Sequence, residues 1–212
     1  VSGFMKLRLR ATDLYASILE NTKEYTPEFK KEVTKFFKGV WGNYADTGDG
    51  VLYHPDGNIK IDLDSKSIRK MNPESIMASD DAVCLKSGVY AKTQMPELNR
   101  REIERHNAKI YKGKQALENK LWRIFARDPN EVPAKYAEDP ALLKTYVKVF
   151  NHLAKIAFKY DKGMGVYVGI PEKYEMARFL IVDNLVGYSD ADGRHIGSSG
   201  NGRFVGVAPE AP

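Results

Sequence analysis

A short turn between two extended segments is the feature that most restricts how this chain can fold. Residues 55–58 read Pro-Asp-Gly-Asn, which combines a proline whose ring fixes φ at about −65° with a glycine that accepts positive φ. Val51–His54 precede this turn and Ile59–Leu63 follow it, with apolar and polar residues alternating in the second segment. A tight turn flanked in this way predicts a β-hairpin over residues 51–63.

Apolar residues at helical spacing predict about five helices around this hairpin. They begin near residues 12, 26, 96, 139 and 171, and the third is the longest, ending near residue 127. In the second helix, Thr26 is suited to the cap and Pro27 to the first helical position. We expect its apolar stripe to be buried: Phe29, Val33, Phe36, Phe37 and Val40.

These elements predict an α+β fold, predominantly α-helical, with the helices and the hairpin around one core. The length of 212 residues fits one domain. The start of the chain alternates apolar with basic residues, which predicts an extended arm, and the end is rich in glycine and serine. We therefore expect an N-terminal arm at 1–11, a single mainly helical domain at 12–186 and an extended C-terminal tail at 187–212.

Cysteine content and hydropathy indicate the cellular setting. The chain has one cysteine, Cys84, and no Asn-x-Ser/Thr sequence, which is typical of a reducing compartment. Its longest apolar run, residues 177–182, is interrupted by Arg178 and is far shorter than the ~20 residues of a spanning helix. We expect an intracellular protein of the cytoplasm or an organelle interior, with no membrane span.

Positive charge is concentrated in two of the predicted helices. The whole chain has a net charge of +5, and residues 97–127 alone hold nine basic and four acidic residues. Basic side chains spaced by three, four or seven residues would form a ridge on each helix. The predicted binding residues are Arg100, Arg101, Arg105, Lys109, Lys112, Lys144, Lys148, Lys155 and Lys159.

Two basic ridges can bind an acidic protein or a phosphate backbone. Aromatic residues are not interleaved with the basic ones, as stacking on nucleic-acid bases would require, and no nucleic-acid-binding motif is present. We expect one or more acidic protein partners in a larger complex, with nucleic acid as the alternative partner. A solvated face that only maintains solubility is the remaining interpretation.

The string from His195 to Arg203 resembles part of the motif of Fic-type AMP transferases. It reads His-Ile-Gly-Ser-Ser-Gly-Asn-Gly-Arg. The resemblance implies His195 as a general base and Arg203 as a ligand of nucleotide phosphates, with an anion-binding turn at 200–202. The string departs from that family at Ser199, where the family has a metal-binding acid. A nucleotidyl transferase is therefore a second alternative.

The remaining chemistry-bearing residues form no recognised constellation. The acidic loops at 46–50, 62–65 and 190–193 lack the spacing of a calcium-binding EF-hand loop. The four histidines include no pair at i, i+4 and no cluster with cysteine. We predict no catalytic residues, no metal site and no cofactor. The predicted function is that of a non-enzymatic structural, linker or adaptor component of a larger assembly.

Overall fold

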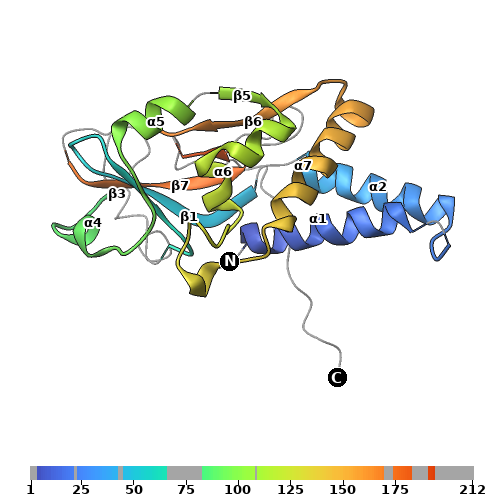
Figure 1. Cartoon of the computed structure of the whole chain (residues 1–212), viewed down its shortest axis with the longest axis horizontal. Helices are drawn as coiled ribbons and strands as arrows, with labels where there is room; N and C mark the ends of the chain where they lie inside the picture. Colours follow the sequence, from blue (N-terminus) through green and yellow to red (C-terminus); the bar gives the residue numbers. More distant parts are fainter. Residues whose placement is uncertain are drawn as a thin grey trace.

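The computed structural model combines a mainly antiparallel sheet with helices that pack around it (Figure 1). The structure describes residues 4–21, 23–42, 45–65, 83–107, 109–169, 174–182 and 191–193. The predicted α+β class is confirmed. The prediction of about five helices around a single hairpin is wrong, because the described residues contain an eight-stranded sheet and a larger number of helices, most of them short.

Two helices at the start of the chain form an antiparallel hairpin, α1 (Phe4–Glu20) and α2 (Pro27–Trp41). The start of α2 is as predicted, because the Thr26 hydroxyl accepts from the amide of Phe29 at 3.2 Å. The predicted N-terminal arm is wrong for the residues that the structure describes, since residues 4–11 belong to α1. Helical winding brings Met5 and Leu9 to one buried face, which the apparent alternation concealed.

The helix predicted to begin near residue 139 is confirmed as α7 (Ala141–Leu153), followed by the π-helix η4 (Ala154–Phe158). Its apolar stripe packs on α1 and on residues 113–118. Large aromatic side chains from three helices meet in this layer: Trp41, Trp122, Tyr146 and Phe150 are each at most 1% exposed. Arg8 is buried among them, because its guanidinium lies 4.7 Å from the Trp41 ring and donates to the Tyr146 hydroxyl.

The long helix predicted over residues 96–127 is wrong. The structure has five short elements there: β4 (Glu97–Leu98), α5 (Arg100–His106), β5 (Lys109–Lys112), the 3₁₀ helix η2 (Gly113–Glu118) and α6 (Lys120–Phe125). Asparagine side chains separate the elements. Asn99 and Asn119 cap α5 and α6, and Asn107 ends α5 and bonds both backbone groups of Val168.

The helix predicted from residue 171 is also wrong over the residues that the structure describes. Residues Met176–Val182 form β7, which pairs with three other strands of the described sheet. Every residue of β7 is at least partly buried, and the strand is apolar apart from Arg178. Periodicity cannot distinguish such a run from a buried helix.

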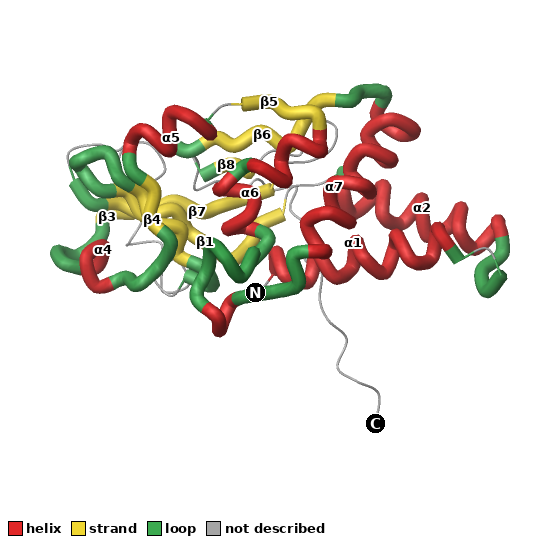
Figure 2. The backbone as a smooth tube through the Cα atoms, in the orientation of Figure 1, coloured by secondary structure: helices red, strands yellow, loops and turns green. Residues whose placement is uncertain are grey.

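The sheet has the strand order β4-β2-β1-β7-β8-β6-β5, with β3 (Val83–Cys84) also paired to β7. The predicted hairpin is confirmed as β1 (Ala45–Tyr53) and β2 (Ile59–Asp62), with Tyr53 opposite Ile59. Residues Lys162–Tyr167 form β6. Figure 2 shows the strands as one layer with α1, α2 and α7 gathered at one end.

Part of the predicted C-terminal tail belongs to the sheet. Residues Ala191–Asp192 form β8, which lies between β7 and β6, antiparallel to the first and parallel to the second. Gly193 follows it, and a Cβ there would come within 2.6 Å of Val51. The rest of the predicted tail, like the string from His195 to Arg203, lies outside the described residues.

A bulge in β1 carries a buried charge pair. The pairing of β1 with β7 shifts register between Asp46 and Asp49, with Gly48 at a φ of 71°. The Thr47 hydroxyl donates to the carbonyl of Leu180 at 2.6 Å and accepts from the amide of Asp49 at 3.2 Å. At the bulge, the Thr47 hydroxyl therefore takes the place of a backbone hydrogen bond of the ladder. The Asp49 carboxylate points away from the strand.

Arg127, just after α6, binds this carboxylate. Its guanidinium donates to Asp49 Oδ1 at 2.8 Å, and the side chains are 2% and 0% exposed. The amide of Asp64 donates to the same oxygen at 2.8 Å. Burial raises the pKa of Asp49, and the guanidinium of Arg127 opposes that rise. The Arg127 carbonyl also accepts from the amide of Glu138, so the pair joins the sheet to the connection between α6 and α7.

Replacing Arg127 by methionine is expected to lower the free energy of unfolding by about 3–5 kcal/mol at neutral pH, because Asp49 remains buried without its cation. The deficit should shrink toward pH ~4, since a buried carboxyl with a raised pKa takes up a proton and the desolvation penalty disappears. Urea unfolding of the Arg127→Met and wild-type chains across this pH range measures the difference.

The matched control is Arg100→Met, which removes the exposed ion pair with Glu104 and should cost at most about 0.5 kcal/mol. Equal losses in the two variants, or a deficit that does not change with pH, would contradict a central role for the buried pair.

Candidate functional site

The first predicted basic ridge is divided between a helix and a strand. Arg100, Arg101 and Arg105 are exposed on α5, and Arg100 pairs with Glu104 at 3.0 Å. Lys109 and Lys112 lie on β5 instead of continuing the helix. The single ridge predicted from helical spacing is therefore wrong, because the chain changes from helix to strand at Asn107.

The second predicted ridge lies on one continuous helical segment. Lys144 and Lys148 are exposed on α7, Lys155 is exposed on η4, and Lys159 follows η4 with a φ of 61°. Lys148 pairs with Glu20 of α1, so one of the four charges is matched within the chain.

The structure assembles a different group of lysines from parts of both ridges. Lys112 on β5 and Lys162 on β6 are directly opposite partners in the antiparallel ladder. Lys114 follows in η2, and Lys155 and Lys159 lie where η4 leads into β6. We call this group the lysine corner: Lys112, Lys114, Lys155, Lys159 and Lys162.

A glycine brings the two sides of the lysine corner together. A Cβ at Gly113 would lie 2.4 Å from Oδ1 of Asn151, so glycine lets η2 approach α7 without displacing the Asn151 side chain. Asn151 is one helical turn before Lys155, and Gly113 lies between Lys112 and Lys114. All five lysines are exposed, and among the described residues none of them forms an ion pair with a carboxylate.

Lys114 and Lys162 were not among the predicted binding residues. The sequence separates Lys112 from Lys162 by 50 positions, and no local signal shows that β5 pairs with β6. Only the register of the sheet places these two like charges opposite one another.

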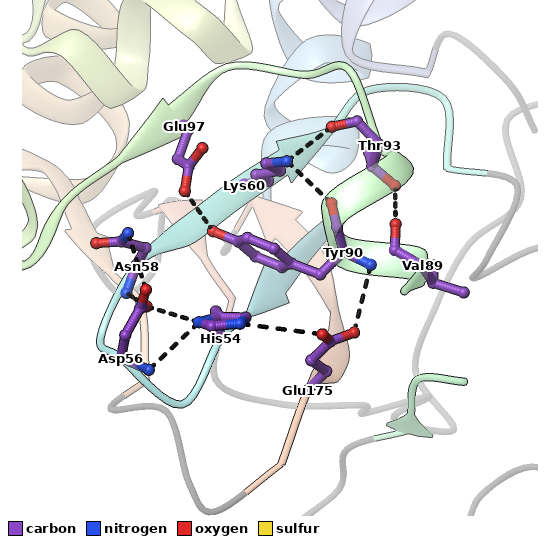
Figure 3. Close-up of polar contacts among 9 residues, drawn as sticks. All are labelled: His54, Asp56, Asn58, Lys60, Val89, Tyr90, Thr93, Glu97 and Glu175. Carbon is purple, nitrogen blue, oxygen red and sulfur yellow. Dashed lines mark hydrogen bonds and ion pairs between the residues drawn. The ribbon is translucent and has the colours of Figure 1, made fainter. Parts of the chain in front are cut away.

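A second polar group, shown in Figure 3, surrounds the one-turn helix α4 (Val89–Lys92). The ammonium of Lys60, on β2, donates to the carbonyls of Tyr90 at 2.9 Å and Thr93 at 3.0 Å. The Glu175 carboxylate accepts from the amide of Tyr90 at 3.4 Å. A cation at its carbonyl end and an anion at its amide end thus stabilise a helix too short to form alone.

Side chains of the β1–β2 turn complete this group (Figure 3). The His54 ring packs against Tyr90 with ring centroids 4.8 Å apart, and its Nδ1 lies 2.8 Å from Asp56 Oδ1. The amide of Asn58 donates to Asp56 and, together with His54, lowers the pKa of that carboxyl. Burial and the neighbouring Glu97, which accepts from the Tyr90 hydroxyl at 3.0 Å, raise the pKa of Tyr90.

The polar contacts of this group hold α4 against the sheet. Tyr90 keeps its proton because its pKa is raised, and Lys60 uses its ammonium on backbone carbonyls. Neither group is placed to accept a proton from a substrate.

The structure brings two of the three acidic loops together around Arg127. Asp49 accepts from the guanidinium at 2.8 Å, and Asp64 lies 3.9 Å from it. The positive charge between these loops is therefore an arginine of the chain itself. Within the part of the chain that the structure describes, no group of three or more His, Cys, Asp or Glu side chains is placed to hold a metal ion.

Comparison with known proteins shows the fold alone. No protein-family model and no curated protein matches the chain. A solved structure that resembles it illustrates the accommodation of massive sequence variation in Nanoarchaeota by the C-type lectin fold. That protein is 12% identical with a TM-score of 0.50, and the match covers 87% of this chain and 80% of the other. The architecture is thus similar to the C-type lectin fold.

Replacing Lys60 by methionine is expected to detach α4 while leaving the sheet intact. Two hydrogen bonds from a charged donor are lost, which should lower the free energy of unfolding by about 1–3 kcal/mol. Hydrogen exchange should accelerate at the amides of Lys92 and Thr93, which bond the carbonyls of Gly88 and Val89. Amides in the β1–β7 ladder should keep their protection.

The exposed lysine of the same helix provides the control. Lys92→Met should leave exchange at the same amides nearly unchanged, because its ammonium makes no hydrogen bond among the described residues. Unchanged protection of Lys92 and Thr93 in the Lys60→Met chain would show that α4 does not depend on this contact.

Proposed function

We propose that this chain is a non-enzymatic structural, linker or adaptor component of a larger assembly, and that it binds an acidic protein partner through the lysine corner. The observation that carries the proposal is the cross-strand pair Lys112–Lys162, extended by three further exposed lysines. Like charges directly opposite one another in a sheet destabilise it, by roughly 0.2–1 kcal/mol per pair. An acidic partner would supply the missing counter-charge.

The scaffold beneath the lysine corner supports binding without rearrangement. Lys112 and Lys162 are held by a strand ladder, and Lys155 by the helical segment that packs on the core. Lysine ammonium groups are compact point charges on flexible stems, so they suit carboxylates whose positions vary. This favours an acidic surface or an acidic segment of a protein as the partner.

The neighbouring aromatic residues favour protein over nucleic acid. The hydroxyl of Tyr111, on β5, accepts from the side chain of Asn119 at 2.7 Å and donates to the carbonyl of His106 at 3.3 Å. Tyr160 packs against the core, and Lys38 covers the ring of Phe158. These rings are therefore engaged within the fold, whereas binding of single-stranded nucleic acid uses exposed rings for stacking.

The expected compartment and the nucleotidyl-transferase alternative stay predictions from the sequence. None of the described helices has the length and hydropathy that crossing a bilayer requires. The intracellular setting remains a proposal based on the single cysteine. The residues of the Fic-like string lie outside the described part of the chain, so nucleotide transfer is not supported by any geometry.

Charge reversal tests the lysine corner. At about 0.1 M salt, the Lys112→Glu/Lys162→Glu double variant should bind poly-L-glutamate at least tenfold more weakly than the wild type, as measured by fluorescence anisotropy. The matched control is Lys23→Glu/Lys86→Glu, which makes the same change in net charge at two exposed loop lysines. Its affinity should fall only about twofold, since charges beyond a Debye length of roughly 10 Å are screened.

Titration with a single-stranded oligonucleotide of equal charge separates the alternatives. Equal weakening in both double variants would mean that net charge alone drives binding, and the lysine corner would not be a site. Oligonucleotide binding that is tighter than poly-L-glutamate binding and depends on Lys112 and Lys162 would replace the acidic protein by nucleic acid.

A further inference from the structure

The α1–α2 hairpin has an apolar face that the other described residues leave exposed. On α1, Leu7 and Leu14 are 37% and 59% exposed, and on α2, Phe29 and Phe36 are 46% and 64% exposed. The sequence predicts a wholly buried stripe on α2, and only Phe37 of these aromatic residues is buried. Exposed phenylalanines at positions with a core pattern indicate a contact outside the described chain.

The spacing of the exposed residues is that of helices that pack along a seam. On α1 the stripe has Leu7, Ala11 and Leu14 exposed and continues to the buried Ile18. On α2 it has Phe29 and Phe36 exposed, with the partly buried Val33 between them. Steps of four, three and four residues keep side chains on one face over several turns, as at the core positions of helix bundles. Neither stripe includes a charged residue.

Both stripes lie on the same side of the hairpin, away from α7. At 100° per residue, Glu20 lies roughly opposite the α1 stripe, and Glu20 pairs with Lys148 of α7. Lys38 lies roughly opposite the α2 stripe, and its ammonium lies over Phe158 of η4. Since α7 and η4 cover one side of the two helices, the stripes share the other side. We call this surface the hairpin face.

We propose that the hairpin face pairs with the same face of a second copy of this chain. A whole aromatic side chain presents ~150–250 Å², so the four exposed side chains offer roughly 400 Å² of apolar surface. A standard interface takes about 800 Å² per partner, of which a homodimer makes roughly 65% apolar. The hairpin face therefore supplies most of the apolar area that one half of a dimer needs.

The apolar stripes of the hairpin face can also pack against identical stripes of a second copy. Because α1 and α2 have stripes of the same spacing, two hairpins related by a twofold axis can interdigitate their leucine and phenylalanine side chains. The product is four helices around a shared apolar centre, an arrangement that two helical hairpins commonly adopt. The lysine corner lies on β5, η2, η4 and β6. These elements take no part in the hairpin, so pairing leaves the lysine corner exposed.

Sedimentation equilibrium of the full chain tests the proposal. A reductant is included because the thiol of Cys84 is exposed and could otherwise crosslink two copies. Over a range of about 1–500 µM, the wild type should show a reversible monomer–dimer equilibrium. Leu14→Gln/Phe36→Gln should weaken dimerisation at least tenfold, and Leu7→Gln/Phe29→Gln is an independent second variant.

The control is Ile156→Gln, because Ile156 is equally exposed but lies on η4. It should dimerise as the wild type does, and thermal melts monitored by circular dichroism should show all variant monomers folded. A wild-type chain that stays monomeric throughout, or a dimer that survives both double substitutions, would overturn the proposal. So would a monomer that binds a different helical protein through Phe36.

Discussion

The ion pair between Arg127 and Asp49 is the interaction on which the rest of this structure depends. It lies where a bulged strand, the β1–β2 hairpin and the connection between α6 and α7 meet, and both side chains are almost wholly removed from water. Burial of two charges is favourable only when each is coordinated, and the amide of Asp64 supplies part of that coordination by donating to the Asp49 carboxylate. The acidic loops at 46–50 and 62–65 therefore surround a cation that the chain itself supplies, the guanidinium of Arg127.

A second set of contacts joins the end of β1 to the residues that follow β6 and β8. The Tyr53 hydroxyl donates to the carbonyl of Gly193 at 2.8 Å and accepts from the amide of Gly169 at 3.0 Å. Residues from three distant parts of the chain are thus joined through one hydroxyl. A Cβ at Gly169 would lie 2.3 Å from the guanidinium of Arg178, so a larger residue there would displace the Arg178 side chain. These contacts fix β6 and β8 beside β7 and, with them, the position of β5.

The two surfaces proposed for binding differ in chemistry and in origin. The lysine corner is polar and arises from strand register, whereas the hairpin face is apolar and arises from helical periodicity. They lie on different elements, so an acidic partner and a second copy of the chain could be bound together. Similarity to the C-type lectin fold does not choose among functions, since one fold supports many sites. The argument for each surface therefore rests on its own residues.

The sequence by itself determined the elements whose signals are local. The Pro-Asp-Gly-Asn turn specified the β1–β2 hairpin, and Thr26 with Pro27 specified the start of α2, because each signal acts within a few residues. The α5 capping box, Asn99 with Glu102, was present in the sequence and could have revealed the break in the long predicted helix.

Only the tertiary structure decided the rest. Asn107 ends α5 because Val168 is beside it, Met176–Val182 is a strand because it pairs with β1 and β8, and Lys112 faces Lys162 because β5 pairs with β6. Such contacts join residues tens of positions apart. Their energies come from burial and strand register, which no short window of sequence contains.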